Sequence, residues 1–348
     1  MRIHNDFPGG NIQVVEVRDN TVVLKNELRD TQQDWFYWAF CVEGAQGREI
    51  TFEFERNRLG YWGPAVSHDY KNWHWLDSVN GDSFTYKFGE DEEKVYFAHH
   101  MLYRPDRLIE FAKENGVEIR ELCKSRDGMS VPSFILGSGE KSIIITARHH
   151  ACESTGSYVM EGIAKELLEA PIENARALFV PFVDYDGVRK GDQGKGRAPY
   201  DHNRDYIAPH VYPETAAILD YAQKNGCNFG LDLHSPWHRG NENDKLFFVR
   251  NLALKLDRFD RFGTLFENEI TEDAMTYKVA DDYPPDTGWN HPKSSFGITM
   301  NRRPECSLAL SLESAYFGTE DNKISTDRLI QTGRCLARAI KKYLATEE

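Results

Sequence analysis

The stretch from residue 142 to residue 169, SIIITARHHACESTGSYVMEGIAKELLE, constrains the fold of this chain more than any other. It begins with a short β-branched apolar run, 142–146, which is typical of a buried strand in a parallel sheet. It ends with an amphipathic helix over about 157–169, where apolar residues recur at helical spacing. The polar turn 148–153 joins the two. A strand, a turn and a helix in this order predict an open α/β sheet, whose chemistry lies at the carboxyl ends of its strands.

The polar turn contains an H-x-x-E pair, His150 and Glu153, and imidazole and carboxylate groups are both ligands of first-row metals. Such a short motif also arises by chance, in which case Glu153 would cap the helix in a solvated turn. Two other interpretations overlap it: His149 and Cys152 as the metal ligands, or Cys152 as a nucleophile with a histidine base. The pair therefore needs support from the rest of the chain.

The first hundred residues are rich in short strands. Aromatic and β-branched runs predict strands at 11–17, 21–26, 34–42, 49–56, 83–88 and 94–98. Ile50, Phe52 and Phe54 alternate with polar residues, which is the period of a half-buried strand. Strands at this spacing predict an antiparallel β-sandwich, and we expect its many tryptophans to serve core and inter-domain packing rather than a ligand-binding face.

Beyond the sandwich, strands and helices alternate. A helix that begins at Pro105 and ends near residue 115 predicts a boundary between a domain of residues 1–115 and a second of residues 116–348. Apolar runs in the second domain predict strands at 142–146, 178–183, 229–233, 246–249 and 307–312. Helical patterns cover 157–169, 214–225, 251–270 and 326–344. This alternation predicts an α/β sheet with helices on both faces.

Composition excludes several classes of protein. The 348 residues carry a formal net charge of −13, which disfavours binding to nucleic acid or to anionic membranes. No apolar run reaches membrane-spanning length, and the first ten residues lack the apolar segment of a signal peptide, so we expect a cytoplasmic protein. The six scattered cysteines contain no C-x-x-C pair and predict neither a disulfide framework nor a cysteine zinc site. Nothing in the sequence specifies an oligomeric state.

The strand at 229–233 supplies a possible third ligand. It leads into His234, and Asp232 lies two residues earlier on the same face, where it can hold the other nitrogen of the imidazole. Together with His150 and Glu153, His234 makes a set of two histidines and one glutamate. Three protein ligands and one open position are the composition of a catalytic zinc site.

Two further segments carry candidate functional groups. The glycine-rich, basic loop 184–206 contains Asn203 and Arg204, and a guanidinium recognises a carboxylate with two hydrogen bonds. Its other interpretations are a flexible solvated loop or a phosphate-binding loop, although the Walker pattern is absent. The strand at 307–312 runs directly into Glu313, which is either a general base or a surface glutamate at a strand end.

The order of these motifs resembles that of the zinc metallocarboxypeptidases. H-x-x-E after a strand, then G-V…N-R, D-L-H and a late glutamate at a strand end resemble most the cytosolic carboxypeptidase branch and its bacterial relatives. Segments 30–40 and 95–105 resemble landmarks of that branch's N-terminal domain, so the resemblance covers nearly the whole chain. It implies an N-terminal β-sandwich followed by an α/β carboxypeptidase-like domain with a mixed sheet covered by helices on both faces.

The resemblance also implies an activity: attack of zinc-bound water, assisted by a glutamate, on the C-terminal peptide or isopeptide bond of a substrate. One Zn²⁺ per chain would be the cofactor. Carried over residue by residue, the resemblance assigns the zinc ligands to His150, Glu153 and His234. It assigns binding of the substrate's terminal carboxylate to Asn203 and Arg204, and the role of general base to Glu313.

Two of the family's functional residues have no counterpart in register. Gly194 stands where the family has the arginine that polarises the scissile carbonyl, and we expect Arg197 to take this role, with Lys195 as the second choice. The family's mobile-loop tyrosine is not in register either, and Tyr277 and Tyr283 are the candidates.

Other departures change the floor of the expected pocket. Ala151-Cys152 replaces the usual Pro-Gly within H-x-x-E, His202 replaces the leucine before N-R, and Ser-Pro-Trp follows His234. The resemblance therefore does not imply specificity for a C-terminal glutamate, and the acidic net charge argues against a polyglutamate substrate.

The sequence leaves two alternatives to a carboxypeptidase. A zinc amidohydrolase that deacylates a small acylated amino acid would use the same metal chemistry and could use the same arginine. A binding protein on this fold would use the sandwich as its recognition surface, but it would have no need of three ligands together with Glu313. In either enzyme the partner is a peptide or a small substrate that carries a carboxylate.

Overall fold

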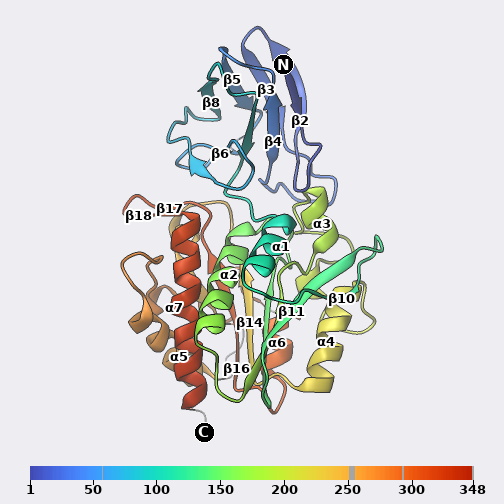
Figure 1. Ribbon diagram of the computed structural model, residues 1–348, viewed down its shortest axis with the longest axis vertical. Coiled ribbons are helices and arrows are strands. Elements are labelled where there is room, and N and C mark those ends of the chain that lie inside the picture. The colour runs from blue at the N-terminus through green and yellow to red at the C-terminus, as the bar shows by residue number, and fades with distance from the viewer. Residues whose placement is uncertain (57, 251–254, 292–293, 347–348) are drawn as a thin grey trace.

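The computed structural model describes residues 1–56, 58–250, 255–291 and 294–346. Strands of the N-terminal domain form one end of the molecule, and a larger α/β domain forms the other (Figure 1). The division of the chain into two domains, with its boundary at residue 115, stays a prediction, and Leu108 and Phe111 of α1 (Pro105–Glu114) pack into the core of the larger domain.

Two sheets face each other in the N-terminal domain, as predicted. One contains, in spatial order, β1 (Arg2–His4), β4 (Ala39–Glu43), β9 (Lys94–Ala98), β6 (Ala65–Ser67) and β7 (His74–Trp75). The other contains β2 (Gln13–Arg18), β3 (Thr21–Lys25), β5 (Glu49–Phe54) and β8 (Ser83–Lys87). Aromatic side chains such as Trp38 and Phe52 fill the core between them. One detail differs from an antiparallel sandwich, because β3 and β5 pair in parallel.

The predicted strand at 34–42 is shorter than expected. It begins only at Ala39, because the preceding aromatic residues leave the sheet and contact the second domain. The backbone N–H of Tyr37 donates to Oε1 of Gln193 at 2.9 Å, and Nε2 of Gln193 donates to the Tyr37 carbonyl at 2.9 Å. A buried glutamine side chain thus replaces a strand partner for this segment.

The tryptophans of the N-terminal domain serve packing, with one exception. Trp38 lies in the sandwich core, while Trp62 and Trp75 donate their indole N–H groups to the Phe317 and Ile324 carbonyls of the second domain. Trp35 differs, since it lines the pocket described below.

The second domain contains a mixed sheet of seven strands. Their spatial order is β10 (Arg120–Lys124), β11 (Ser130–Gly137), β13 (Ala175–Val180), β12 (Lys141–Ala147), β14 (Phe229–His234), β16 (Leu308–Ser314) and β15 (Leu246–Val249). The central strands β13, β12, β14 and β16 run parallel, and the outer strands β11 and β15 are antiparallel to their neighbours. The predicted mixed sheet is confirmed.

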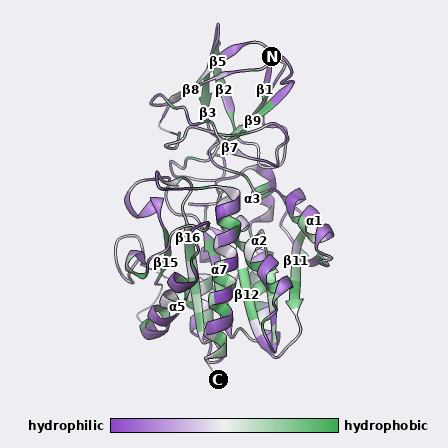
Figure 2. Ribbon diagram, turned by 60° about the vertical axis from the view of Figure 1, so that its left-hand side comes forward, coloured by the Kyte–Doolittle hydropathy of each residue, from purple (hydrophilic) through white to green (hydrophobic). Residues whose placement is uncertain are grey.

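Helices cover both faces of this sheet, also as predicted. On one face lie α2 (Ser154–Glu169), α7 (Thr326–Ala345) and α5 (Leu256–Glu269), and their apolar sides pack on the strands (Figure 2). On the other lie α4 (Pro213–Asn225) and α6 (Phe296–Asn301). α2 and α7 meet at Gly162 and Gly333, where an added Cβ would lie 1.9 and 2.0 Å from backbone oxygens of the facing helix, so only glycine permits this approach.

Helix ends differ slightly from the expectations. α2 begins at Ser154, three residues before the predicted start, because the polar turn leads straight into it. The first four residues of the predicted helix 251–270 lie outside the described residues, and the described helix is α5. None of the described helices combines the length and apolarity needed to cross a bilayer.

Candidate active site

Three neighbouring parallel strands deliver the candidate residues to one edge of the sheet. β12 leads into the turn that carries His150 and Glu153, β14 ends at His234, and β16 carries Glu313. His234 and Glu313 are direct register partners. Because parallel strands end at the same edge, residues separated by up to 163 positions in the sequence meet here.

The two imidazoles converge on one buried carboxylate. Nδ1 of His150 lies 2.9 Å from Oε1 of Glu153, and Nδ1 of His234 lies 2.8 Å from Oε2 of the same residue. Glu153 is fully buried, and although it occupies the N-cap position of α2, its side chain makes no capping hydrogen bond. The alternative that Glu153 is a solvated helix cap is therefore wrong.

The surrounding groups prepare both histidines to bind a metal through Nδ1. Nε2 of His234 lies 2.6 Å from Oδ2 of Asp232, and Nε2 of His150 lies 3.7 Å from Oδ1 of Asp201. With a metal in place of the Nδ1 proton that Glu153 now accepts, a carboxylate behind Nε2 would keep the other proton on that nitrogen and leave the Nδ1 lone pair to the ion. One ligand atom from each of His150, Glu153 and His234 lies within 4.8 Å of the others. This donor set fits a zinc ion.

A second group of potential ligands, His149, Asp232 and His234, fits less well. Nδ1 of His149 lies 2.7 Å from Asp232, and its Nε2 lies 2.7 Å from the Tyr206 hydroxyl, so both ring nitrogens already have partners. His149 is fully buried and does not line the pocket. We therefore assign it a supporting role behind Asp232.

Cysteine chemistry at the turn is also disfavoured. Cys152 is buried, its sulfur lies 3.7 Å from the Tyr316 hydroxyl, and it does not line the pocket. Burial raises the pKa of the Cys152 thiol to about 12, whereas a nucleophilic cysteine needs a lowered pKa.

A pocket of about 550 Å³ opens above the triplet. His150, His234, Asn203, Arg204 and Glu313 line it, together with Trp237, from the Ser-Pro-Trp segment noted in the sequence, and with Trp35 and Trp289, which the sequence did not single out for the site. The three tryptophan rings come from three separate segments, so no local pattern could have indicated that they share a wall.

The position of Glu313 suits a general base that acts in the pocket. Its side chain reaches the pocket, and Oε2 is buried without a hydrogen-bond partner among the described residues. Burial raises the pKa of Glu313, which brings the carboxylate closer to the basicity that proton transfer at neutral pH requires.

Asn203 and Arg204 lie in a short 3₁₀ turn, η1 (His202–Arg204), beside the triplet. Oδ1 of Asn203 accepts from the backbone N–H of Phe296 at 3.2 Å, and its Nδ2 lies 3.2 Å from Nε2 of His234. Arg204 donates to the Asn203 carbonyl at 3.3 Å and has no acidic partner in the described part of the chain. Its guanidinium is therefore available to a carboxylate in the pocket.

Lys195 and Arg197 lie on opposite sides of the loop. Nζ of Lys195 lines the pocket, 2.5 Å from Oε1 of Glu153 and 4.7 Å from the centroid of the Trp35 ring. Arg197 points the other way, into a separate cavity of about 420 Å³. There it pairs with Asp184 at 2.7 Å, Asp192 at 2.8 Å and Asp30 at 3.1 Å. The structure does not bring Arg197 to the pocket, because three largely buried carboxylates hold it elsewhere.

Gly194 explains why this loop departs from the family pattern. Its φ is +79°, and an added Cβ would lie 2.0 Å from the backbone nitrogen of Ala151, within the H-x-x-E turn. No arginine fits at this position, since the two backbones touch. The carboxylate of Asp30, from the N-terminal domain, accepts the N–H groups of Gln193 and Gly194 at 3.0 and 2.8 Å and holds the loop against the turn.

Neither candidate for the mobile-loop tyrosine lines the pocket. Tyr277 is buried, and its hydroxyl donates to Asp282 at 3.0 Å. Tyr283 stacks on Trp289 with ring centroids 4.8 Å apart, so it reaches the pocket only through that tryptophan.

The fold is that of the metallocarboxypeptidases. A metallo-carboxypeptidase from Burkholderia cenocepacia superposes with a TM-score of 0.82 at 19% identity, and the match covers 100% of both chains. A metallo-carboxypeptidase from Pseudomonas aeruginosa, solved in complex with (2-guanidinoethylmercapto)succinic acid, superposes with a TM-score of 0.81 at 19% identity over 100% of both chains.

Sequence comparisons lead to the same group of proteins. Residues 3–100 match the model of the cytosolic carboxypeptidase N-terminal domain. The chain is 28% identical over 257 residues to an uncharacterized protein of Zymomonas mobilis, which is 67% of each chain. It is 30% identical over 162 residues to cytosolic carboxypeptidase 2 of Xenopus tropicalis, and 24% identical over 404 residues to cytosolic carboxypeptidase 4 of Mus musculus.

These matches confirm the resemblance inferred from the motifs. The match to the Xenopus carboxypeptidase covers 39% of this chain but only 17% of that protein. The match to the mouse carboxypeptidase covers 91% of this chain but only 36% of that protein. The named relatives and structural neighbours are carboxypeptidases, which are hydrolases, the enzyme class expected from the sequence.

Proposed function

We propose that this protein is a zinc-dependent metallocarboxypeptidase that hydrolyses the C-terminal peptide or isopeptide bond of a peptide substrate. The observation that carries the proposal is the convergence, around one pocket of about 550 Å³, of the ligand triplet, the unpartnered carboxylate of Glu313 and the available guanidinium of Arg204. The name of the matched domain model supports the cytoplasmic location expected from the sequence.

His150, Glu153 and His234 would hold one zinc ion. Bound zinc supplies Lewis acidity, which makes water a better nucleophile and stabilises negative charge on a carbonyl oxygen. Glu313 takes the proton of the attacking water and then gives it to the leaving amine. Burial raises the pKa of Glu313, which favours both taking the proton from water and giving it to the amine.

The two cations of the pocket have separate tasks. Arg204, supported by Asn203, binds the free carboxylate of the substrate, which restricts cleavage to the last residue. Lys195 faces the charge that develops on the scissile carbonyl oxygen, the role for which Arg197 is the sequence-based candidate. The support for Lys195 is its position, because it lies at the triplet while Arg197 is paired in another cavity.

Zinc-loaded protein incubated with a mixed peptide pool and followed by mass spectrometry tests the proposal, with Glu313→Gln as the matched control. We expect the wild type to remove single C-terminal residues. Glu313→Gln should retain zinc and lose about 10²–10⁴-fold in turnover, the usual contribution of a general base.

An unchanged pool would contradict carboxypeptidase activity. Hydrolysis of N-acyl amino acids by the same preparation would then indicate the amidohydrolase alternative. Protein that retains no zinc and binds peptides without cleaving them would indicate a binding protein.

A further inference from the structure

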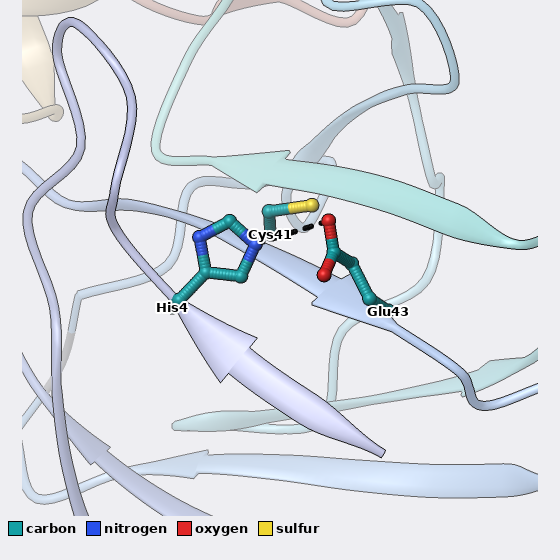
Figure 3. A group of neighbouring side chains, drawn as sticks. All are labelled: His4, Cys41 and Glu43. Carbon is teal, nitrogen blue, oxygen red and sulfur yellow. Dashed lines mark ion pairs between the residues drawn. The ribbon is translucent and has the colours of Figure 1, made fainter.

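We propose that His4, Cys41 and Glu43 form a second metal site, structural rather than catalytic, in the N-terminal domain, and that zinc is the ion it suits best. The three side chains point toward one another across β1 and β4 (Figure 3). This site shares no residue with the proposed active site, so the proposal does not depend on the proposed function and can be tested separately.

Strand register brings the three residues together. β1 and β4 are antiparallel neighbours, with His4 directly opposite Cys41 and Arg2 opposite Glu43. Cys41 and Glu43 are two residues apart on β4, so their side chains leave the same face of the sheet. His4 leaves that face too, as a direct cross-strand pair of Cys41.

One of the three spacings between donor atoms already matches a tetrahedral ion, and the other two lie within reach of it. Nε2 of His4 lies 3.4 Å from Oε1 of Glu43, and one ligand atom of each residue lies within 4.8 Å of the other two. Zinc bonds of about 2.0–2.3 Å place tetrahedral ligand atoms about 3.3–3.8 Å apart, so only small shifts of the side chains would close the site. An imidazole, a thiol and a carboxylate are each established zinc ligands.

Burial points to a missing partner. Nε2 of His4 is sealed from solvent, yet it has no hydrogen-bond partner within the described ranges. Cys41 is fully buried with a free thiol, while Glu43 keeps 39% of its side chain exposed. A buried polar atom without a hydrogen bond needs an explanation, and an ion between Nε2 and Glu43, reached through the exposed side of Glu43, provides one.

Asp6 stands in the position of an orienting group. Its backbone N–H donates to Nδ1 of His4 at 3.2 Å, which places the imidazole proton on Nε2 in the metal-free protein. An ion at Nε2 would move that proton to Nδ1, so the Asp6 N–H would have to turn away from Nδ1, and Oδ2 of Asp6, now 4.0 Å away, would become the acceptor. Arg2, whose Nη1 lies 3.6 Å from Oε2 of Glu43, is the competing cation.

The surroundings indicate a structural role. None of the three residues lines either of the cavities described above. The ion would instead tie the three-residue strand β1 to β4, at the edge of the five-stranded sheet. Three protein ligands and a fourth from water complete a tetrahedron.

Cobalt substitution of the full-length protein separates the two sites. A cysteine ligand gives Co²⁺ a thiolate-to-metal absorption in the near ultraviolet, and the catalytic triplet contains no cysteine. We expect two metal equivalents per chain by elemental analysis, together with this absorption. Cys41→Ser and His4→Gln should each lose one equivalent and the absorption, and both should keep the other equivalent and the peptidase activity.

Matched controls make the result unambiguous. Cys123→Ser, which removes a half-buried thiol of the second domain, should keep both equivalents and the absorption. Glu153→Gln should lose the other equivalent and keep the absorption, which distinguishes the two proposals. If Cys41→Ser does not fold, the metal content and absorption of His4→Gln, on the more accessible edge strand β1, test the second site. One equivalent in the wild type, or an absorption that survives Cys41→Ser, would show that His4 and Glu43 form an ordinary ion pair.

Discussion

Two regions of this molecule each gather three metal-ligating side chains, in different settings. His150, Glu153 and His234 lie where parallel strands end, under an open pocket. His4, Cys41 and Glu43 lie on the face of an antiparallel strand pair, away from that pocket. Strand ends leave space above the ligands for a substrate, whereas a strand face surrounds its ligands with neighbouring strands.

The two regions also differ in what stands behind the ligands. In the catalytic domain, Asp232 and Asp201 lie behind the imidazoles, and Lys195, Arg204 and Glu313 approach from the pocket. In the N-terminal domain, Asp6 lies behind His4. Similar donor atoms can thus serve catalysis or stability, and the position in the fold decides which.

The largest contrast is expected between Glu153→Gln and Glu43→Gln. Glu153→Gln should lose the catalytic metal, and kcat/KM should fall by at least about 10³-fold, because the metal contributes several kcal/mol to the transition state. Glu43→Gln should leave kcat/KM unchanged. Peptide hydrolysis and metal content measured side by side check both. Equal losses of activity would mean that the two regions are not separate in function.

The next contrast concerns two cations of one loop. Lys195→Met should lower kcat by about 10²–10³-fold, the usual effect of removing one donor to an oxyanion. Arg197→Met leaves Asp30, Asp184 and Asp192 without their common partner, so it should lower the free energy of unfolding by about 3–5 kcal/mol. Urea unfolding and single-turnover kinetics separate the effects. A folded Arg197→Met with the kinetic defect, beside an active Lys195→Met, would restore Arg197 to the catalytic role.

A smaller kinetic effect is expected at Arg204. Arg204→Ala should raise KM by roughly 10–100-fold for substrates with a free C-terminal carboxylate, since a charged hydrogen bond contributes about 1.5–3 kcal/mol. C-terminally amidated peptides should respond far less, and the metal content should not change. Arg126→Ala, which alters only the second cavity, is the matched control. An unchanged KM in Arg204→Ala would remove this residue from substrate binding.

The junction between the two domains should affect stability more than activity. His100 and His238 are buried there, and burial, together with Arg148 and Arg239 respectively, lowers the pKa of each imidazole to about 3. Below a pH of about 6.5 the unfolded chain takes up protons that the folded protein excludes, so the free energy of unfolding should fall as the pH drops from about 6.5 toward 3. Urea unfolding across this range measures the slope.

Replacing one of these imidazoles tests the cause. His238→Gln should flatten the decline, because the unfolded chain then has one histidine fewer to protonate. An identical slope in His238→Gln and the wild type would exclude the buried histidines as the source.

The sequence by itself determined the architecture and most of the candidate site. The apolar runs that became β12, β14 and β16 are short and continuous, and each is followed at once by its polar residue. Because a parallel sheet aligns the ends of its strands, local pattern is enough to predict that His150, His234 and Glu313 meet. The order of motifs then indicated a resemblance to the metallocarboxypeptidases, which the comparisons confirm.

Tertiary structure decided which cation serves the pocket. Lys195 and Arg197 are two residues apart, and the sequence favoured Arg197, with Lys195 as the second choice. Only the contact between Gly194 and Ala151, with Asp30 of the other domain fixing the loop, sends Lys195 to the triplet and Arg197 away from it. The three tryptophans of the pocket wall, and the pairing of His4 with Cys41 and Glu43, likewise come from segments that meet only on folding. Sequence patterns report which face or end of an element a residue occupies, whereas contacts between distant elements depend on packing, which no local pattern records.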